Sequence, residues 1–141
     1  MKSLCIVLLC ILMQHNTFSD PVAIIVSKNT LLSNITVNEV QDIYYGKIAV
    51  LSNGLVPLPI DYCCDNELRD DFYRKLLGKS LSKMTGYWST LVFTGQVTPP
   101  RQLPSVSVVI YAIQENPTAI GFSYLAPVKN RQDVKILYIL P

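Results

Sequence analysis

The sequence predicts an α/β domain, because segments with strand composition alternate with segments that have helical periodicity. Val22–Val26 is a continuous apolar run of strand length, as expected for a strand that is covered on both faces. The chain has 141 residues, of which 50% are hydrophobic, so it fits a single domain and not a disordered polymer.

Two helices are predicted by their end signals and apolar faces. Thr36–Glu39 is a capping box, with a hydroxyl cap and a glutamate three residues later, and Gly46 stands where that helix ends. After a loop over 61–66, a second helix runs to about Leu77 and is closed by Gly78. Its apolar positions, four residues apart, are Leu68, Phe72 and Leu76.

The segments around the second helix predict a strand, a third helix and a loop. Leu55–Ile60 has strand composition, and Pro57 and Pro59 push it toward a sheet edge or a hinge. Ser80 caps the third helix, and Thr94–Pro104, rich in Gly and Pro, predicts a loop. The apolar stripe of the third helix consists of Leu81, Met84, Trp88, Leu91 and Val92.

The end of the chain contains one ambiguous segment and two strands. In Ser105–Asn116 the β-branched residues favour a strand, whereas the length and the following Pro117 favour a helix. Ala119–Leu125 and Val134–Leu140 predict closing strands.

The start of the chain predicts an export signal that is removed. Met1-Lys2 is a short basic start, Leu4–Met13 is an unbroken apolar run, and Thr17–Ser19 offers a cleavage site. Ten apolar residues span only about 15 Å as a helix, too short for a bilayer core of about 30 Å. We therefore expect a signal peptide at 1–19, a domain at 20–141 in the periplasm or outside the cell, and no membrane span after cleavage.

Loss of this leader limits the chemistry of the mature chain. It removes His15, the only histidine, together with Cys5 and Cys10, and leaves Cys63 and Cys64. A Ser-His-Asp triad, a Cys-His dyad, a His-ligated zinc centre and a Cys₄ zinc site are excluded. We expect no enzyme activity, no cofactor and no metal. Eleven basic and ten acidic side chains remain, a net charge of +1, which argues against a nucleic-acid partner.

Acidic residues concentrate in Asp61–Asp71. The segment holds five of the ten acids and one basic residue, Arg69, a net charge of −4. Asp65 or Asn66 caps the second helix, and basic residues gather at its other end, so the pattern complements a helix macrodipole.

Cys63 and Cys64 are adjacent in the sequence. Neighbouring α-carbons lie about 3.8 Å apart, whereas disulfides prefer about 4.4–6.8 Å, so a bridge between them is strained and easily reduced. Two small thiols packed in a loop are the simpler interpretation, and a redox role or intermolecular pairing stays open.

Several segments in a fixed order carry a resemblance to a known family. They are Val40–Lys47, Phe72–Gly78, Tyr87-Trp88, Phe93–Gly95, Pro99–Arg101 and Ala119–Phe122. Together they resemble short single-lobe proteins related to the substrate-binding proteins of phosphate ABC transporters. The resemblance implies a single lobe of a type 2 periplasmic binding protein-like fold, with a central mixed sheet flanked by helices. It also implies that 105–116 is a helix.

The resemblance implies an oxyanion site at the start of the second helix, where the family presents hydroxyls and backbone N–H groups to phosphate. The matching stretch departs from that pattern: Asn66 stands at the serine position, Glu67 at a glycine and Leu68 at the threonine. If an anion binds, the expected ligand residues are these three with Arg69 and Arg101. Each carboxylate at about 4 Å opposes it by on the order of 4 kcal/mol at an effective dielectric of about 20.

These observations predict an exported, solute-binding-protein-like domain that binds phosphate or another small oxyanion in connection with phosphate transport. The alternative is an interaction module that has lost the phosphate site and contacts an envelope protein.

Overall fold

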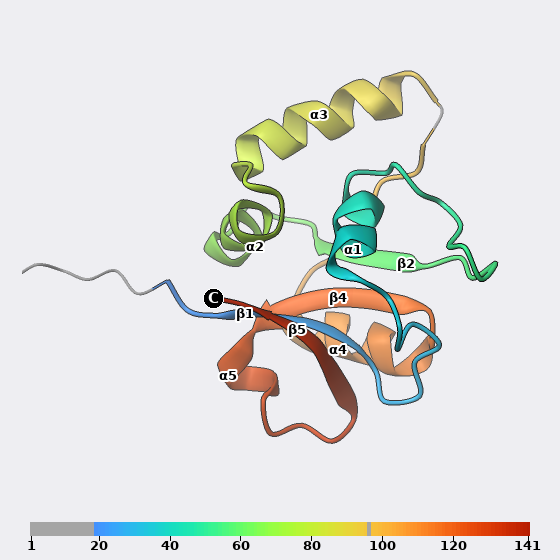
Figure 1. Ribbon diagram of the computed structural model, residues 1–141. Coiled ribbons are helices and arrows are strands. Elements are labelled where there is room, and N and C mark those ends of the chain that lie inside the picture. The colour runs from blue at the N-terminus through green and yellow to red at the C-terminus, as the bar shows by residue number, and fades with distance from the viewer. Residues whose placement is uncertain (1–18, 96) are drawn as a thin grey trace, which may run out of the picture.

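The apolar run near the start of the chain forms β1 (Val22–Ser27), and all six of its residues are buried. The computed structural model describes residues 19–95 and 97–141 and places β1 between β4 (Ala119–Tyr124) and β5 (Val134–Leu140), antiparallel to both (Figure 1). A strand that is covered on both faces has no polar side, which explains why its sequence shows no alternation.

β2 (Leu58–Tyr62) and β3 (Arg101–Leu103) complete a five-stranded sheet in the order β3-β2-β4-β1-β5. β2 is parallel to both β3 and β4, so the sheet is mixed, as the sequence predicts. β3 lies within the expected loop Thr94–Pro104. Three residues are too few for a strand pattern to appear in the sequence.

The expected edge position of β2 is wrong, because β3 lies outside it. Leu58 donates its amide to the carbonyl of Thr118, on the β4 side. The nitrogen of Pro59 therefore faces the other side, where pairing with β3 begins only at Ile60. A proline is tolerated here because its missing N–H has no partner strand to satisfy.

The first three helices form where their caps and apolar faces predict them, and two further helices follow. They are α1 (Val37–Tyr44), α2 (Glu67–Leu77), α3 (Leu81–Phe93), α4 (Val106–Glu115) and the short α5 (Leu125–Val128), which the sequence analysis does not predict. The ambiguous segment Ser105–Asn116 is a helix. Asn66 and Ser80 cap α2 and α3 as expected. Along α3 the predicted stripe is buried at Leu81, Met84 and Trp88, whereas Val92 is exposed.

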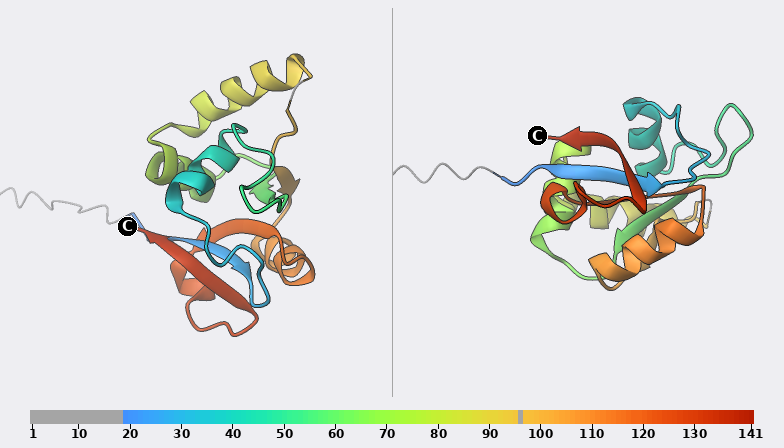
Figure 2. Two further views of the ribbon diagram at one scale, coloured as in Figure 1. Left: turned by 45° about the vertical axis from the view of Figure 1, so that its right-hand side comes forward. Right: turned by 90° about the horizontal axis from the view of Figure 1, so that it is seen from below.

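Two neighbouring residues of β4 show how the helices cover both faces of the sheet. Phe122 stacks on Phe72 of α2, with ring centroids 3.6 Å apart, and contacts Tyr44 of α1 edge to face. Gly121 faces the opposite side, where a Cβ atom would lie 2.9 Å from Ile113 of α4. Figure 2 shows the same arrangement from two further sides. In the described part of the chain, no helix has the length and apolar character needed to cross a membrane.

Gly46 ends the first helical segment and lies against the only tryptophan. Its φ is +69°, and a Cβ atom there would lie 2.6 Å from the Trp88 ring. Gly78 ends α2 with a φ of +66°, and a Cβ atom there would have no neighbour within 4 Å among the described residues. The two glycines share a backbone conformation and differ in the space beside them.

We predict that Gly46→Ala destabilises the fold more than Gly78→Ala. The left-handed conformation costs both variants about 1–2 kcal/mol. Overpacking against Trp88 adds about 1–3 kcal/mol to Gly46→Ala alone. Urea unfolding of the two variants measures the difference, and equal losses would contradict the contact between Gly46 and Trp88.

Candidate functional site

The candidate site lies at one edge of the sheet. Because β2, β3 and β4 are parallel, their carboxyl ends meet at the same edge, and α2 and α4 start there. Ligands of open α/β sheets bind at this edge, where helix N-termini present free amides.

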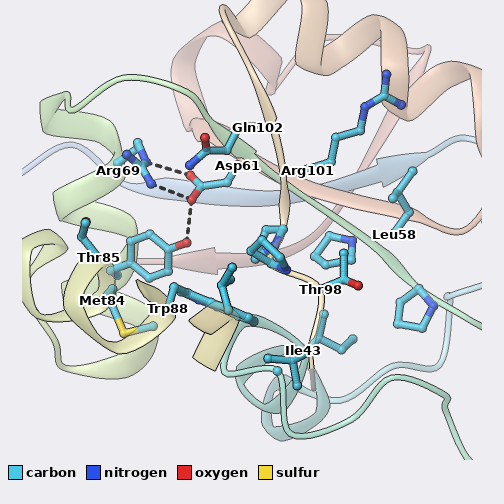
Figure 3. Close-up of a pocket in the computed structure, with 18 of the residues that line it drawn as sticks. Ile43, Leu58, Asp61, Arg69, Met84, Thr85, Trp88, Thr98, Arg101 and Gln102 are labelled. Atoms are coloured by element: carbon cyan, nitrogen blue, oxygen red, sulfur yellow. Dashed lines mark hydrogen bonds and ion pairs between the residues drawn. The ribbon is translucent and has the colours of Figure 1, made fainter. Parts of the chain in front are cut away.

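A buried ion pair holds the start of α2 against the end of β2. Asp61 in β2 accepts two hydrogen bonds from the guanidinium of Arg69, from Nε to Oδ1 and from Nη2 to Oδ2, both 2.9 Å (Figure 3). The side chains are only 4% and 8% exposed. Such a pair is stable in the interior only if the remaining lone pairs of the carboxylate are satisfied.

Two further groups satisfy this carboxylate. The hydroxyl of Tyr73 donates to Oδ2 and the backbone N–H of Tyr62 donates to Oδ1, each at 2.7 Å. Burial, followed by the charge of Asp61, raises the pKa of Tyr73, so its hydroxyl remains a donor. Burial opposes the charge of Arg69, but its contacts with Asp61 outweigh this and raise the pKa of Arg69. Each oxygen of the Asp61 carboxylate therefore accepts two hydrogen bonds, and Arg69 keeps its positive charge.

The remaining contacts of Arg69 leave little of its charge for a ligand. Its Nη1 lies 3.3 Å from Oδ1 of Asp65 and 3.5 Å from the carbonyl oxygen of Cys64. Asp65 is 87% exposed, so this second ion pair is weak. Arg69 thus faces two carboxylates, and the cluster carries a net negative charge.

The N-terminus of α2 presents the backbone donors that the sequence predicts. The side chain of Asn66 accepts from the N–H of Arg69 at 2.8 Å, which uses its oxygen as a helix cap. Among the described residues, the N–H groups of Glu67 and Leu68 have no hydrogen-bond acceptor. These two amides are the candidate donors to an anion.

A cleft of about 1100 Å³ opens beside the ion pair. Its walls come from the end of α1, β2, the first turns of α2, one side of α3 and the segment 97–102. Asp61, Asp65 and Arg69 lie at one end, and Trp88 forms part of an apolar wall. Within the part of the chain that is described, the indole N–H of Trp88 is buried without a hydrogen-bond partner.

The structure separates the five predicted ligand residues. Arg69 and Arg101 line the cleft, whereas Asn66, Glu67 and Leu68 do not. Figure 3 shows the Arg101 guanidinium turned away from the Asp61–Arg69 pair, while Gln102 lies beside it.

Sequence reasoning missed the partners of Arg69 and the cleft. A strand extended to Tyr62 would have placed Asp61 in the sheet. Tyr73 on the buried face of α2 would then have indicated a hydrogen-bond partner for its carboxylate. In the described part of the chain, no three His, Cys, Asp or Glu side chains gather into a group that could hold a metal ion.

Comparison with solved structures identifies the fold as that of periplasmic binding proteins. An ABC-type phosphate transport receptor from Vibrio cholerae matches with a TM-score of 0.62 at 20% identity, over 84% of this chain and 45% of the receptor. A protein from Clostridium perfringens, described as a phosphate ABC transporter substrate-binding protein with bound phosphate, matches with a TM-score of 0.63 at 20% identity. That match covers 84% of this chain and 44% of the other.

The chain therefore spans less than half the length of these structures, as a single lobe does. No protein-family model and no curated protein matches the sequence. The single-lobe fold that the resemblance implies is confirmed.

We predict that Asp61→Asn lowers the free energy of unfolding by about 3–5 kcal/mol, because it leaves Arg69 buried without its counter-charge. Asp65→Asn removes the exposed partner of the same guanidinium and is expected to cost less than about 1 kcal/mol. Chemical denaturation of both variants checks this prediction, and a similar loss in the two would argue against the buried pair as the stronger contact.

Proposed function

We propose that the chain is an extracytoplasmic, solute-binding lobe whose ligand is a small oxyanion of the phosphate type, held at the start of α2. The observation that carries this proposal is that the amides of Glu67 and Leu68 have no acceptor among the described residues and lie at the edge of the sheet where open α/β folds bind ligands. Helix N-termini attract anions through the helix dipole and through donors that need no reorganisation.

Each predicted ligand residue has a distinct part in this proposal. The backbone N–H groups of Glu67 and Leu68 donate to the anion. The side chain of Asn66 caps the helix by accepting from the N–H of Arg69. Arg69 orients the first turn through Asp61 and contributes little free charge. Arg101 lines the cleft, which Glu67 and Leu68 do not, and its guanidinium points away from the ion pair, so this proposal gives it no direct contact with the anion.

The affinity is expected to be weak, about millimolar, which corresponds to about −4 kcal/mol. Asp61 already balances the charge of Arg69. Glu67, which supplies one of the two donors, also carries an exposed carboxylate that repels an anion. A single lobe also leaves one side of a small ion in water, where competition for its hydrogen bonds is strong.

No step of this proposal transforms the ligand. The solved neighbours are described as receptors and binding proteins, which supports a binding role without enzyme activity. Export is also a proposal. The expected signal peptide at 1–19 lies, apart from Ser19, outside the described residues. The alternative of an envelope interaction module stays a hypothesis that no contact described above favours.

We predict that titration with inorganic phosphate at low ionic strength shifts the amide NMR signals of Glu67 and Leu68 more than those of the sheet. Calorimetry on the same sample gives the affinity. Absence of both heat and selective shifts at millimolar phosphate, in a folded sample, would overturn anion binding at this helix.

A matched pair of variants tests the donor itself. Glu67 is the first residue of α2, where proline is tolerated, and Asn66 before it has the extended backbone that proline requires (φ −151°, ψ 165°). Glu67→Ala removes the carboxylate and keeps the N–H, so phosphate should bind several-fold more tightly. Glu67→Pro removes both and should bind roughly tenfold more weakly than Glu67→Ala, because a hydrogen bond to a charged group contributes about 1.5 kcal/mol or more. Equal affinity in the two variants would contradict the role of this amide.

A further inference from the structure

Two exposed thiols lie side by side directly after β2. The Sγ atoms of Cys63 and Cys64 are 3.3 Å apart, and both residues are exposed. Neither thiol has a part in the oxyanion site proposed above, whose donors are backbone N–H groups of α2. Their chemistry can therefore be considered independently of anion binding.

The backbone on both sides of the pair is held in place. Cys63 donates its N–H to the carbonyl of Leu103 in β3 at 3.0 Å. The carbonyl of Cys64 accepts from Nδ2 of Asn66 at 3.4 Å and from Nη1 of Arg69 at 3.5 Å. These anchors hold the two exposed cysteines directly after β2, and Cys63 is part of the lining of the cleft.

We propose that Cys63 and Cys64 form a reactive dithiol site that exchanges with low-molecular-weight disulfides and closes reversibly into a bridge between adjacent residues. The observation behind it is the Sγ–Sγ contact between two accessible thiols. A small disulfide is the co-reactant because it can reach both exposed thiols directly. A protein disulfide would first have to dock against this surface.

The exchange balances in two steps. The thiolate of Cys63 attacks one sulfur of a disulfide RSSR, which breaks the S–S bond, forms a mixed disulfide and releases one thiolate RS⁻. Cys64, after losing its proton to solvent, attacks the Cys63 sulfur of that mixed disulfide and releases the second RS⁻. The two protein thiols lose two electrons and two protons, and the small disulfide is reduced to two thiols.

The geometry places the second thiol within reach of the first and makes the product easy to reduce. The sulfur atoms need to approach only from 3.3 Å to about 2.05 Å, whereas capture of a second small molecule requires a new encounter. The α-carbons of neighbouring residues stay about 3.8 Å apart, below the range of ordinary disulfides, so the bridge is strained and more oxidising. Its hydrogen bond with Cys63 raises the pKa of Cys64, which is consistent with Cys63 reacting first.

The test uses the full chain with Cys5→Ser and Cys10→Ser, so that all thiol chemistry belongs to Cys63 and Cys64. The reduced protein is equilibrated with mixtures of oxidised and reduced glutathione, alkylated and weighed by mass spectrometry. The expected product is a monomer that has lost two hydrogens, resists alkylation and carries the bridge in the peptide containing both residues. A dithiol reductant should restore both thiols.

Cys63→Ser and Cys64→Ser are the matched controls, and both should fold because the replaced side chains are exposed. Each should stop at the adduct with one glutathione and form no internal bridge. The proposal is overturned if the intact pair accumulates glutathione adducts, forms covalent dimers or stays reduced across the whole range of mixtures. Phosphate titration of the same samples is a separate readout, so failure of one proposal leaves the other decided by its own measurement.

Discussion

The structure depends on the buried ion pair between Asp61 and Arg69. The carboxylate accepts from four donors, two of them on one guanidinium, and therefore joins the end of β2 to the first turns of α2. A buried carboxylate without these donors would cost several kcal/mol, so the fold tolerates few positions of α2 relative to the sheet. This restraint sets the orientation of the helix N-terminus and forms one end of the cleft.

The same pair limits what the site can recognise. In a site built for phosphate, an arginine with free donors supplies bidentate hydrogen bonds and charge. Here the guanidinium of Arg69 is already used by Asp61, and Asp65 approaches its remaining nitrogen. What is left for an anion is the backbone of Glu67 and Leu68, whose partial charges are fixed by the helix. The guanidinium of Arg69 stabilises the fold through Asp61 and is therefore not free to bind an anion. This is the physical reason to expect weak binding.

The sequence predicted the regular elements well, because their signals are local. Capping residues, apolar spacing and closing glycines lie within one helix, and the buried strands show as apolar runs. The site was harder to predict, and the cause is an error of two residues. Ending the strand at Ile60 placed Asp61 in a loop, where it was assigned to the helix dipole, whereas the strand continues to Tyr62 and buries that carboxylate. Its partner Arg69 then appeared to be free for a ligand. Contacts between a strand and a helix depend on such boundaries, which propensity alone does not define.

The environment of Cys64 shows that contact with the neighbouring thiol raises its pKa although an arginine lies close by. A thiol close to a helix N-terminus and an arginine ordinarily has a lowered pKa. The pKa of Cys64 is instead raised, first by the hydrogen bond with Cys63 and then by the charge of that neighbour, which together outweigh Arg69. Arg69 lowers the pKa of Cys64 by less than these contacts raise it. The reactivity of the two thiols therefore depends on their contact with each other. Arg69 of the ion pair helps to hold the backbone of Cys64 in place.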